Sequence, residues 1–178
     1  MDGRKLWRRL NQGWAGVLFS IFLGVVFATF FYYVVLATAL QTSLPVVAVV
    51  SSSMQHDSPE FTHYGWLEKN LNYHNRTFVE SWSVPNGFSI GDMPIVQGAN
   101  RYDAGDVVVY RVEGQPAPII HRIIKVNDDG TFQTKGDNNL SQLSYELSVK
   151  KEQIHGRVIF IIPKLGYVKV LASKILGI

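Results

Sequence analysis

The chain of 178 residues contains no cysteine. Disulfide bonds and thiolate metal sites are therefore excluded, although an extracytoplasmic location is not, because a domain outside the cytoplasm can lack disulfides. The sequence also has no charged residue between Arg9 and Asp57. A segment of this length without charge can contain a membrane-spanning helix.

The apolar core of this gap, residues 15–40, predicts a transmembrane helix. At 1.5 Å per residue it would reach about 39 Å, more than the roughly 30 Å hydrocarbon core of a bilayer. A cleaved secretory signal is the alternative, with Ala37-Thr38-Ala39 as its cleavage site, but the apolar core of a signal has only about 7–15 residues. Basic residues precede the helix at positions 4, 5, 8 and 9. The positive-inside rule then predicts a cytoplasmic N-terminus, residues 1–14, and an extracytoplasmic remainder.

The net charge of +3 is unevenly distributed. Residues 1–9 and residues 164–178 each carry +3, whereas the residues between them sum to −3. A slightly acidic domain lacks the basic surface that nucleic acids require, so no nucleic-acid partner is expected. The C-terminal segment, residues 164–178, is too short and charged to span a membrane and is predicted to be an amphipathic tail on the bilayer or on the domain.

Residues 41–163 predict a mainly β domain. Short apolar runs bounded by turn residues favour strands. The runs are residues 44–50, 93–96, 107–110, 119–126, 131–134 and 157–162. Asn127-Asp128-Asp129-Gly130 predicts a hairpin turn, and the close spacing of the runs is typical of a partly closed β-barrel or folded sheet. Residues 55–92 form an irregular insert in which Thr62 could cap a short helix ending near Tyr73.

A serine follows the first predicted strand, and a histidine lies within a later one. The two segments are Val49-Val50-Ser51-Ser52-Ser53-Met54 and Ile119-Ile120-His121-Arg122-Ile123. A serine hydroxyl needs a base within hydrogen-bond reach to act as a nucleophile, and His121 is the one histidine in a predicted strand. The combination beside a membrane anchor favours a membrane-bound serine protease.

The chain resembles signal peptidase I of the archaeal and endoplasmic-reticulum branch. Four segments carry the resemblance: Ser51-Ser52-Ser53-Met54, the strands after Gly91-Asp92 and Gly105-Asp106, Ile120-His121-Arg122, and Lys135-Gly136-Asp137-Asn138-Asn139. The resemblance implies that Ser53 is the nucleophile and His121 its base, that Ser51 assists the oxyanion hole, and that Met54 helps to line a substrate pocket. It also implies an endopeptidase that removes N-terminal signal peptides from secreted and membrane pre-proteins and cuts after small residues.

The acidic partner of His121 departs from the family pattern. Relatives usually carry an aspartate six residues after the aspartate of Gly-Asp-Asn-Asn, and Leu143 stands there in this chain. Asp137 belongs to a matched segment and is the preferred partner, with Glu146 as the alternative. Because of Leu143, a catalytically divergent membrane-anchored binding or assembly protein of the same fold is the alternative function.

No metal or other cofactor is expected. His56, Asp57 and His63 could cluster, but they lack a spacing such as H-E-x-x-H. The expected partners are pre-protein signal peptides, the lipid bilayer and, as a further candidate, the protein-secretion channel. The expected location is the cell membrane or an endoplasmic-reticulum-type membrane, crossed once. Asn75-Arg76-Thr77 and Asn139-Leu140-Ser141 match the N-glycosylation pattern, which also arises by chance.

Overall fold

The computed structural model describes residues 13–167 and divides the chain into two units after Ala39. The first unit is one apolar helix, made of α2 (Gly13–Phe30), the π-helical η1 (Phe31–Leu36) and α3 (Ala37–Ala39). It has 27 residues, an 18-residue window of which has a mean hydropathy of 2.2, and it is long and apolar enough to cross a membrane. The predicted N-terminal apolar helix is thus confirmed. Of the predicted cytoplasmic segment, residues 1–14, the last two already belong to α2 and residues 1–12 lie outside the described residues. Most of the predicted amphipathic tail, residues 164–178, also lies outside them, from residue 168 onward.

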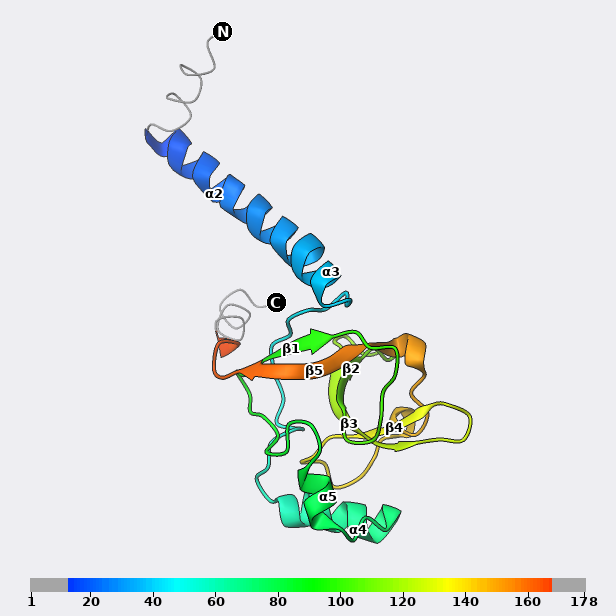
Figure 1. The fold of residues 1–178 in the computed structure, drawn as a ribbon. Helices are drawn as coiled ribbons and strands as arrows, with labels where there is room; N and C mark the ends of the chain where they lie inside the picture. The colour runs from blue at the N-terminus through cyan, green and yellow to red at the C-terminus, as the bar shows by residue number, and fades with distance from the viewer. Residues whose placement is uncertain (1–12, 168–178) are drawn as a thin grey trace. The chain divides into compact units, whose positions relative to one another are not determined.

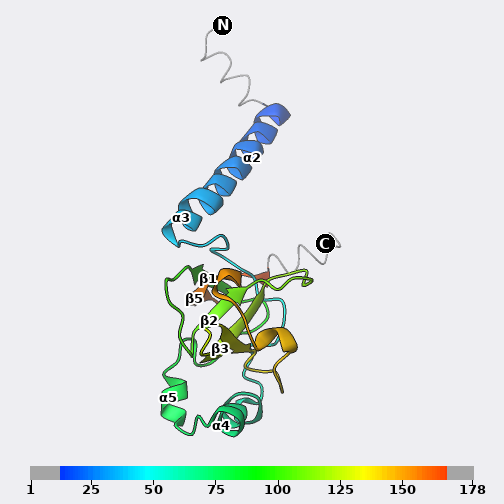
Figure 2. The same cartoon turned by 90° about the vertical axis from the view of Figure 1, so that its right-hand side faces the viewer.

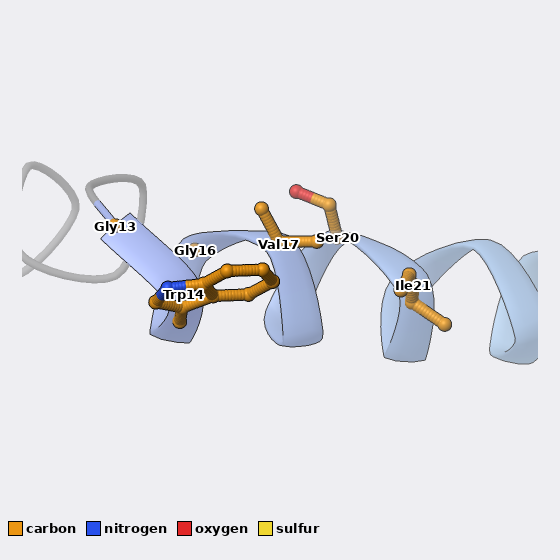
Figure 3. Close-up of a pocket in the computed structure, with 6 residues that line it drawn as sticks. All are labelled: Gly13, Trp14, Gly16, Val17, Ser20 and Ile21. Atoms are coloured by element: carbon orange, nitrogen blue, oxygen red, sulfur yellow. The ribbon is translucent and has the colours of Figure 1, made fainter.

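A shallow hollow on the first turns of α2 is drawn in Figure 3. Trp14, Val17 and Ile21 lie along it and are largely exposed. None of the side chains that line it carries a titratable group, so this surface belongs to the apolar anchor and offers no acid or base for catalysis.

The second unit is built on a five-stranded antiparallel sheet (Figure 1). In sequence order its strands are β1 (Met93–Gln97), β2 (Val107–Tyr110), β3 (Ile119–Val126), β4 (Phe132–Lys135) and β5 (Ile154–Ile162). Their order in the sheet is β1-β5-β2-β3-β4. The last strand therefore lies between β1 and β2 and pairs with both. The mainly β fold is confirmed, and the sheet in the described residues is open rather than closed into a barrel.

Residues 44–50 run beside β1 without forming a regular strand, so this predicted strand is wrong. Val46 forms an isolated bridge with Ile95. Val47 N donates to the Pro94 carbonyl at 3.2 Å. Pro45 has no N–H to donate, and the irregular register of β1 after Ile95 interrupts the ladder further.

The β3–β4 hairpin agrees with its sequence signal. Gly130 N donates to the Asn127 carbonyl at 3.0 Å, and Asn127 N donates to the Thr131 carbonyl at 2.8 Å. The register places Arg122 opposite Lys135. Because the strands are antiparallel, the chain that leaves Lys135 passes the beginning of β3, where His121 lies.

The insert contains more helix than the sequence indicates. It forms η2 (Glu60–Tyr64), α4 (Gly65–Leu71) and α5 (Arg76–Glu80). Thr62 is not a helix cap, because it lies inside η2 and its hydroxyl donates to the Ser58 carbonyl at 3.1 Å. Leu67, Val79 and Trp82 form a buried cluster with Ile124 of β3. Figures 1 and 2 both show α4 and α5 at the β3 side of the sheet, away from β1.

Candidate active site

The loop that carries Ser53 is fixed by the core and by the Gly-Asp-Asn-Asn turn. Met54 is only 1 % exposed and packs in a core cluster that includes Phe88. The Met54 carbonyl accepts a hydrogen bond from Phe88 N at 3.0 Å, and the Ser53 carbonyl accepts one from Asn138 N at 2.8 Å. The backbone at Ser53 and Met54 is therefore held in place. Met54 anchors this loop, and its side chain does not line the neighbouring cavity.

His121 is held in β3 by an acid behind its ring. Its Nδ1 lies 2.5 Å from Oε1 of Glu146, and the Glu146 side chain is fully buried. Glu146 ends the single-turn helix η3 (Ser144–Glu146), and its other oxygen accepts from Leu143 N at 2.7 Å. Both carboxylate oxygens are thus occupied. An acid hydrogen-bonded to Nδ1 fixes the tautomer and leaves Nε2 as the acceptor.

Gly136 marks the point where the serine loop and the histidine meet. A Cβ atom at this residue would lie 2.8 Å from the Ser53 carbonyl oxygen and 2.9 Å from His121 Nε2. Both atoms therefore surround the same small space, although Ser53 and His121 are far apart in the sequence. A glycine is needed here because real Cβ atoms essentially never approach so closely. The Ser53 carbonyl and the imidazole thus lie beside the same glycine, and a contact between the Ser53 hydroxyl and His121 stays a prediction.

A cavity of about 390 Å³ opens beside these two residues. Its walls come mainly from residues 48–50 and 115–120, which contribute alanine, valine, proline and isoleucine side chains. The polar side chains that reach it are Ser51, Ser53, Gln115, His121, Asn139 and Tyr145. The cavity thus has mainly apolar walls, and the side chains of Ser53 and His121 lie at its surface. Such a surface suits a short apolar peptide segment.

Ser51 lies next to the nucleophile candidate. Its Oγ is 3.2 Å from Oγ of Ser53. Within residues 13–167 the Ser53 hydroxyl forms its hydrogen bond with Ser51. It forms none there with His121 Nε2. In unliganded enzymes the bond between nucleophile and base is often long and tightens only when substrate binds.

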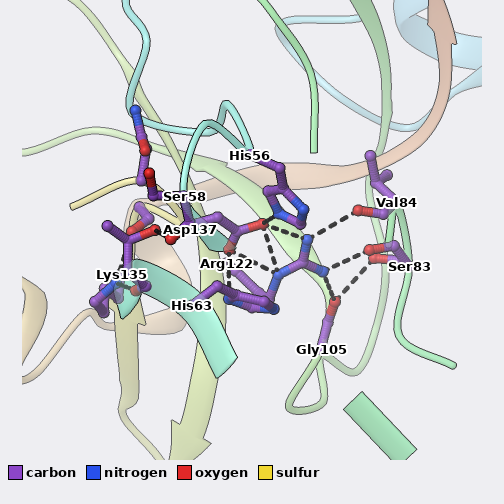
Figure 4. Close-up of polar contacts among 12 residues, drawn as sticks. His56, Ser58, His63, Ser83, Val84, Gly105, Arg122, Lys135 and Asp137 are labelled. Carbon is purple, nitrogen blue, oxygen red and sulfur yellow. Dashed lines mark hydrogen bonds and ion pairs between the residues drawn. The ribbon is translucent and has the colours of Figure 1, made fainter. Parts of the chain in front are cut away.

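Asp137, the preferred acid, does not take the place expected for it. It forms a bidentate ion pair with Arg122, whose Nε and Nη2 lie 2.9 and 2.7 Å from its two oxygens. Arg122 also donates to backbone carbonyls of Ser83, Val84 and Gly105 (Figure 4). Glu146, the alternative acid, is the one that contacts His121. The reason is strand geometry, since His121 and Arg122 are consecutive and their side chains leave β3 on opposite faces.

Two histidines of the insert complete the network around Asp137. His56 Nε2 lies 3.0 Å and His63 Nδ1 3.4 Å from its carboxylate oxygens (Figure 4). Burial alone would raise the pKa of Asp137, but the Arg122 charge and the His56 hydrogen bond hold it well below its usual range. Burial lowers the pKa of His63 to about 4, against the attraction of Asp137. The network therefore combines an ionised Asp137 and Arg122 with a neutral His63 near pH 7.

Lys135 is a further buried charge of this region. Its Nζ donates to the carbonyl oxygens of Thr62 and Gly136. Burial lowers the pKa of Lys135 to about 8. Because Thr62 belongs to the insert and Gly136 to the turn, the lysine joins the insert to the turn behind the serine loop.

His56, His63 and Asp137 are also the group in the described part of the chain that comes nearest to a metal site, with ligand atoms within 4.8 Å of one another. Asp57, which the sequence suggested as a third ligand, instead accepts from Asn138 Nδ2 at 3.1 Å. Both oxygens of Asp137 already bind Arg122. A second cation would have to displace or oppose that guanidinium, so the cluster is better described as an ion-pair network.

Two sets of contacts in this site were not predicted from the sequence. The sequence assigned no catalytic or binding role to Asn138 and Asn139, yet Asn138 holds the serine loop and Asn139 lines the cavity. His56 and His63 were placed in an irregular insert, although both contact Asp137. The sequence carries no local signal for those contacts, because more than seventy residues separate each histidine from Asp137. For Asn138, its place in a segment matched to the family was the available signal.

The chain has similar proteins among characterised sequences. It is 36 % identical over 111 residues to a signal peptidase complex catalytic subunit of Komagataella phaffii, covering 54 % of this chain and 65 % of that protein. Proteins of the same name from Candida tropicalis and Leptosphaeria maculans are 34 % and 33 % identical over 106 and 108 residues, covering 54 % of this chain and 64 % and 62 % of theirs.

The matches thus span a little less than two thirds of the relatives' length. No family model matches the chain. The identity extends over about half of this chain and recurs in several fungal proteins that bear one name. The predicted resemblance is thereby confirmed, and the chain is similar to the catalytic subunits of signal peptidase I of the endoplasmic-reticulum type.

Proposed function

We propose that this protein is a membrane-bound serine endopeptidase that removes N-terminal signal peptides from secreted and membrane pre-proteins. The observation that carries the proposal is the convergence of the Ser53 loop and His121 Nε2 around Gly136, at the edge of an apolar cavity. The names of the similar proteins and the apolar N-terminal helix support the same function.

In the proposed reaction, Ser53 Oγ attacks the scissile carbonyl carbon while His121 Nε2 takes its proton. The carbonyl π electrons move to oxygen and form a tetrahedral oxyanion. His121 then gives the proton to the leaving amine as the oxyanion re-forms the carbonyl and the C–N bond breaks, which leaves an acyl-enzyme. A water next attacks the acyl carbon while His121 takes its proton, and His121 gives that proton to Ser53 Oγ as the ester bond breaks and the acid is released. Glu146 stabilises the imidazolium through Nδ1 in both steps. This assignment replaces Asp137 by Glu146 as the acidic partner.

Ser51 is proposed to assist the oxyanion hole. Its hydroxyl lies 3.2 Å from Ser53 Oγ, and the Ser53 N–H is the other proposed donor. A donor aimed at the developing negative charge typically lowers the barrier by about 2.7–4 kcal/mol. Met54 has no direct role in this scheme, since it is buried in the core.

The apolar walls of the cavity support substrates with small uncharged side chains before the cut. Val50, Ile119 and Ile120 lie beside the two reactive residues and limit the width available. Charged side chains would lose their hydration there without gaining a partner. The proposed substrates are therefore signal peptides with small residues before the cleavage site, in line with the resemblance.

The proposed location is an endoplasmic-reticulum-type membrane, with a cytoplasmic N-terminus and the second unit on the opposite side. The basic residues before α2 support this orientation. Confinement of enzyme and signal peptide to one bilayer raises their effective concentration. Other subunits of a signal peptidase complex are proposed partners on the strength of the relatives' names alone. The secretion channel is a proposed partner from the proposed function only.

Cleavage of a radiolabelled pre-protein by the full chain in lipid vesicles tests the proposal. Ser53→Ala should abolish cleavage, whereas Ser52→Ala should leave it nearly unchanged, because the exposed Ser52 hydroxyl forms no hydrogen bond within residues 13–167. A chelator should have no effect. Equal cleavage by the wild type and Ser53→Ala would contradict the proposal. A wild type that binds the pre-protein without cutting it would favour the binding or assembly protein.

A further inference from the structure

Two Asn-x-Ser/Thr triplets occur in the chain, and the structure gives them different surroundings. Oligosaccharide transfer to such a triplet requires an accessible asparagine amide nitrogen on the surface. The first triplet, Asn75-Arg76-Thr77, lies in the insert, and the second, Asn139-Leu140-Ser141, follows the Gly-Asp-Asn-Asn turn. The proposed peptidase reaction requires glycosylation of neither triplet.

Asn75 is exposed and already oriented for modification. It precedes α5 with φ −88° and ψ 95°, which is an extended conformation. Its Oδ1 accepts a hydrogen bond from Phe78 N at 3.0 Å, and within residues 13–167 its Nδ2 has no partner. The hydrogen bond turns Oδ1 towards the helix and leaves Nδ2 free. Thr77, the third residue of the triplet, is exposed as well.

The segment that carries Asn75 is well fixed, so this exposure does not depend on a loose loop. Arg76 forms ion pairs of 2.8 Å with Glu60 and Glu80 and lies 4.3 Å from the centre of the Tyr64 ring. Val79 is buried in the cluster that holds the insert on β3. A sugar attached to Nδ2 would leave the domain without disturbing these contacts.

Asn139 is in the opposite situation. It is half-buried and lines the cavity beside Ser53 and His121. Its Nδ2 lies 2.8 Å from the position that a Cβ at Gly136 would take, next to His121 Nε2. An oligosaccharide there would fill the 390 Å³ cavity that the proposed substrate needs.

We propose that Asn75 is an N-glycosylation site and that Asn139 is left unmodified in the folded protein. In the transfer, Asn75 Nδ2 forms a bond to the anomeric carbon of an oligosaccharide carried by a lipid diphosphate. The bond from that carbon to the diphosphate oxygen breaks, the lipid diphosphate leaves with the electron pair, and one amide proton is lost to a base of the transferase. The inference rests on the proposed topology, because such transfer occurs on the extracytoplasmic side.

Expression of the full chain in eukaryotic cells, followed by peptide-N-glycosidase treatment and electrophoresis, tests the inference. The wild type should gain mobility by the mass of one oligosaccharide. Two variants should run like the treated protein: Asn75→Asp, whose carboxylate can still accept from Phe78 N, and Thr77→Ala, which keeps Asn75 itself. Ser141→Ala removes the second triplet at an exposed position and should leave the wild-type shift unchanged.

A second glycosylation triplet, introduced by mutation, distinguishes a wrong assignment of Asn75 from a wrong membrane topology. Asp129→Asn creates a new Asn-Gly-Thr triplet in the exposed β3–β4 turn, where an amide oxygen can replace the carboxylate that accepts from Thr131. This variant should carry two oligosaccharides. A reporter site modified without Asn75 would overturn the inference and leave the topology intact. No modification of either site would overturn both, and loss of an oligosaccharide in Ser141→Ala would show that Asn139 had been modified.

Discussion

Glu146 lies directly behind His121, with its Oε1 atom 2.5 Å from Nδ1, and it is fully buried there. Position 143, where relatives usually have an aspartate, is a leucine, and its backbone N–H binds the other oxygen of Glu146. The proposed acid thus stands three residues further along the chain than in the family pattern, close to one helical turn. The short helix η3 brings its longer side chain to the imidazole.

The first prediction concerns this acid. Glu146→Gln should lower kcat by up to about 10⁴-fold, because an amide behind the imidazole favours the wrong tautomer and cannot stabilise the imidazolium. The shape of the side chain is kept, so the protein should still fold. Initial rates of pre-protein cleavage, together with a thermal unfolding curve, provide the measurement. A variant with full activity would exclude Glu146 from the reaction.

The second prediction concerns Asp137 and distinguishes it from Glu146. Asp137→Asn leaves the fully buried Arg122 without its counter-charge, and loss of one partner of a buried pair typically costs about 3–5 kcal/mol. We therefore expect a large loss in the free energy of unfolding, measured by urea denaturation. Cleavage by the fraction that remains folded should fall less than in Glu146→Gln. A stable, inactive Asp137→Asn protein would instead restore Asp137 as the partner of His121.

The contrast between these two acids shows how far the sequence leads. The strand that holds His121 and the hairpin turn that follows it were both predictable, because each has a local pattern of apolar or turn residues. Which carboxylate forms a hydrogen bond with His121 depends on how two loops fold over opposite faces of β3. No local sequence pattern predicts that arrangement. Matched family segments favoured Asp137, but its carboxylate forms an ion pair with Arg122 instead.

The insert shows the same limit. Its polar and aromatic composition gave little periodicity, so its packing against β3 and its two histidine contacts with Asp137 were not expected. By contrast, the length and composition of residues 15–40 were enough to predict the apolar helix, because no tertiary contact is needed for that inference.

The third prediction concerns the meeting point of the two loops. Gly136→Ala introduces a Cβ less than 3 Å from both His121 Nε2 and the Ser53 carbonyl. These atoms must move apart, and a displacement of about 1 Å in a catalytic group can cost about 10²-fold in rate. We expect a fall in kcat of that order. Gly114→Ala, where a Cβ would meet nothing within 4 Å, is the control and should cost some stability through its positive φ but little activity. Equal activity of the two variants would contradict the geometry.

The fourth prediction concerns Ser51. Ser51→Ala removes the hydroxyl 3.2 Å from Ser53 Oγ and should lower kcat by about 10²–10³-fold, with little change in KM, if it contacts only the oxyanion. Ser51→Thr keeps the hydroxyl and should recover part of the rate. Steady-state cleavage of a signal-peptide substrate gives both constants. A rise in KM alone would assign Ser51 to substrate binding.

The fifth prediction concerns the pH dependence of stability. Burial lowers the pKa of His63 from 6.5 to about 4, so between these values the unfolded chain binds a proton at this residue and the folded chain does not. The unfolded state binds more protons in this window, and stability must therefore rise with pH from about 4 to 6.5. The contribution of His63 is on the order of 3 kcal/mol across the window. Below it, protonation of Asp137 removes further stability, because its pKa is lowered in the folded state.

His63→Gln should flatten this rise, since glutamine does not titrate, whereas His74→Gln, at an exposed position, should leave it unchanged. Burial also lowers the pKa of His155, so the slope should be reduced rather than abolished. Urea unfolding of both variants and the wild type at several pH values in the window provides the measurement. Parallel curves for His63→Gln and the wild type would mean that His63 has the same pKa in the folded and unfolded states, which would contradict the prediction.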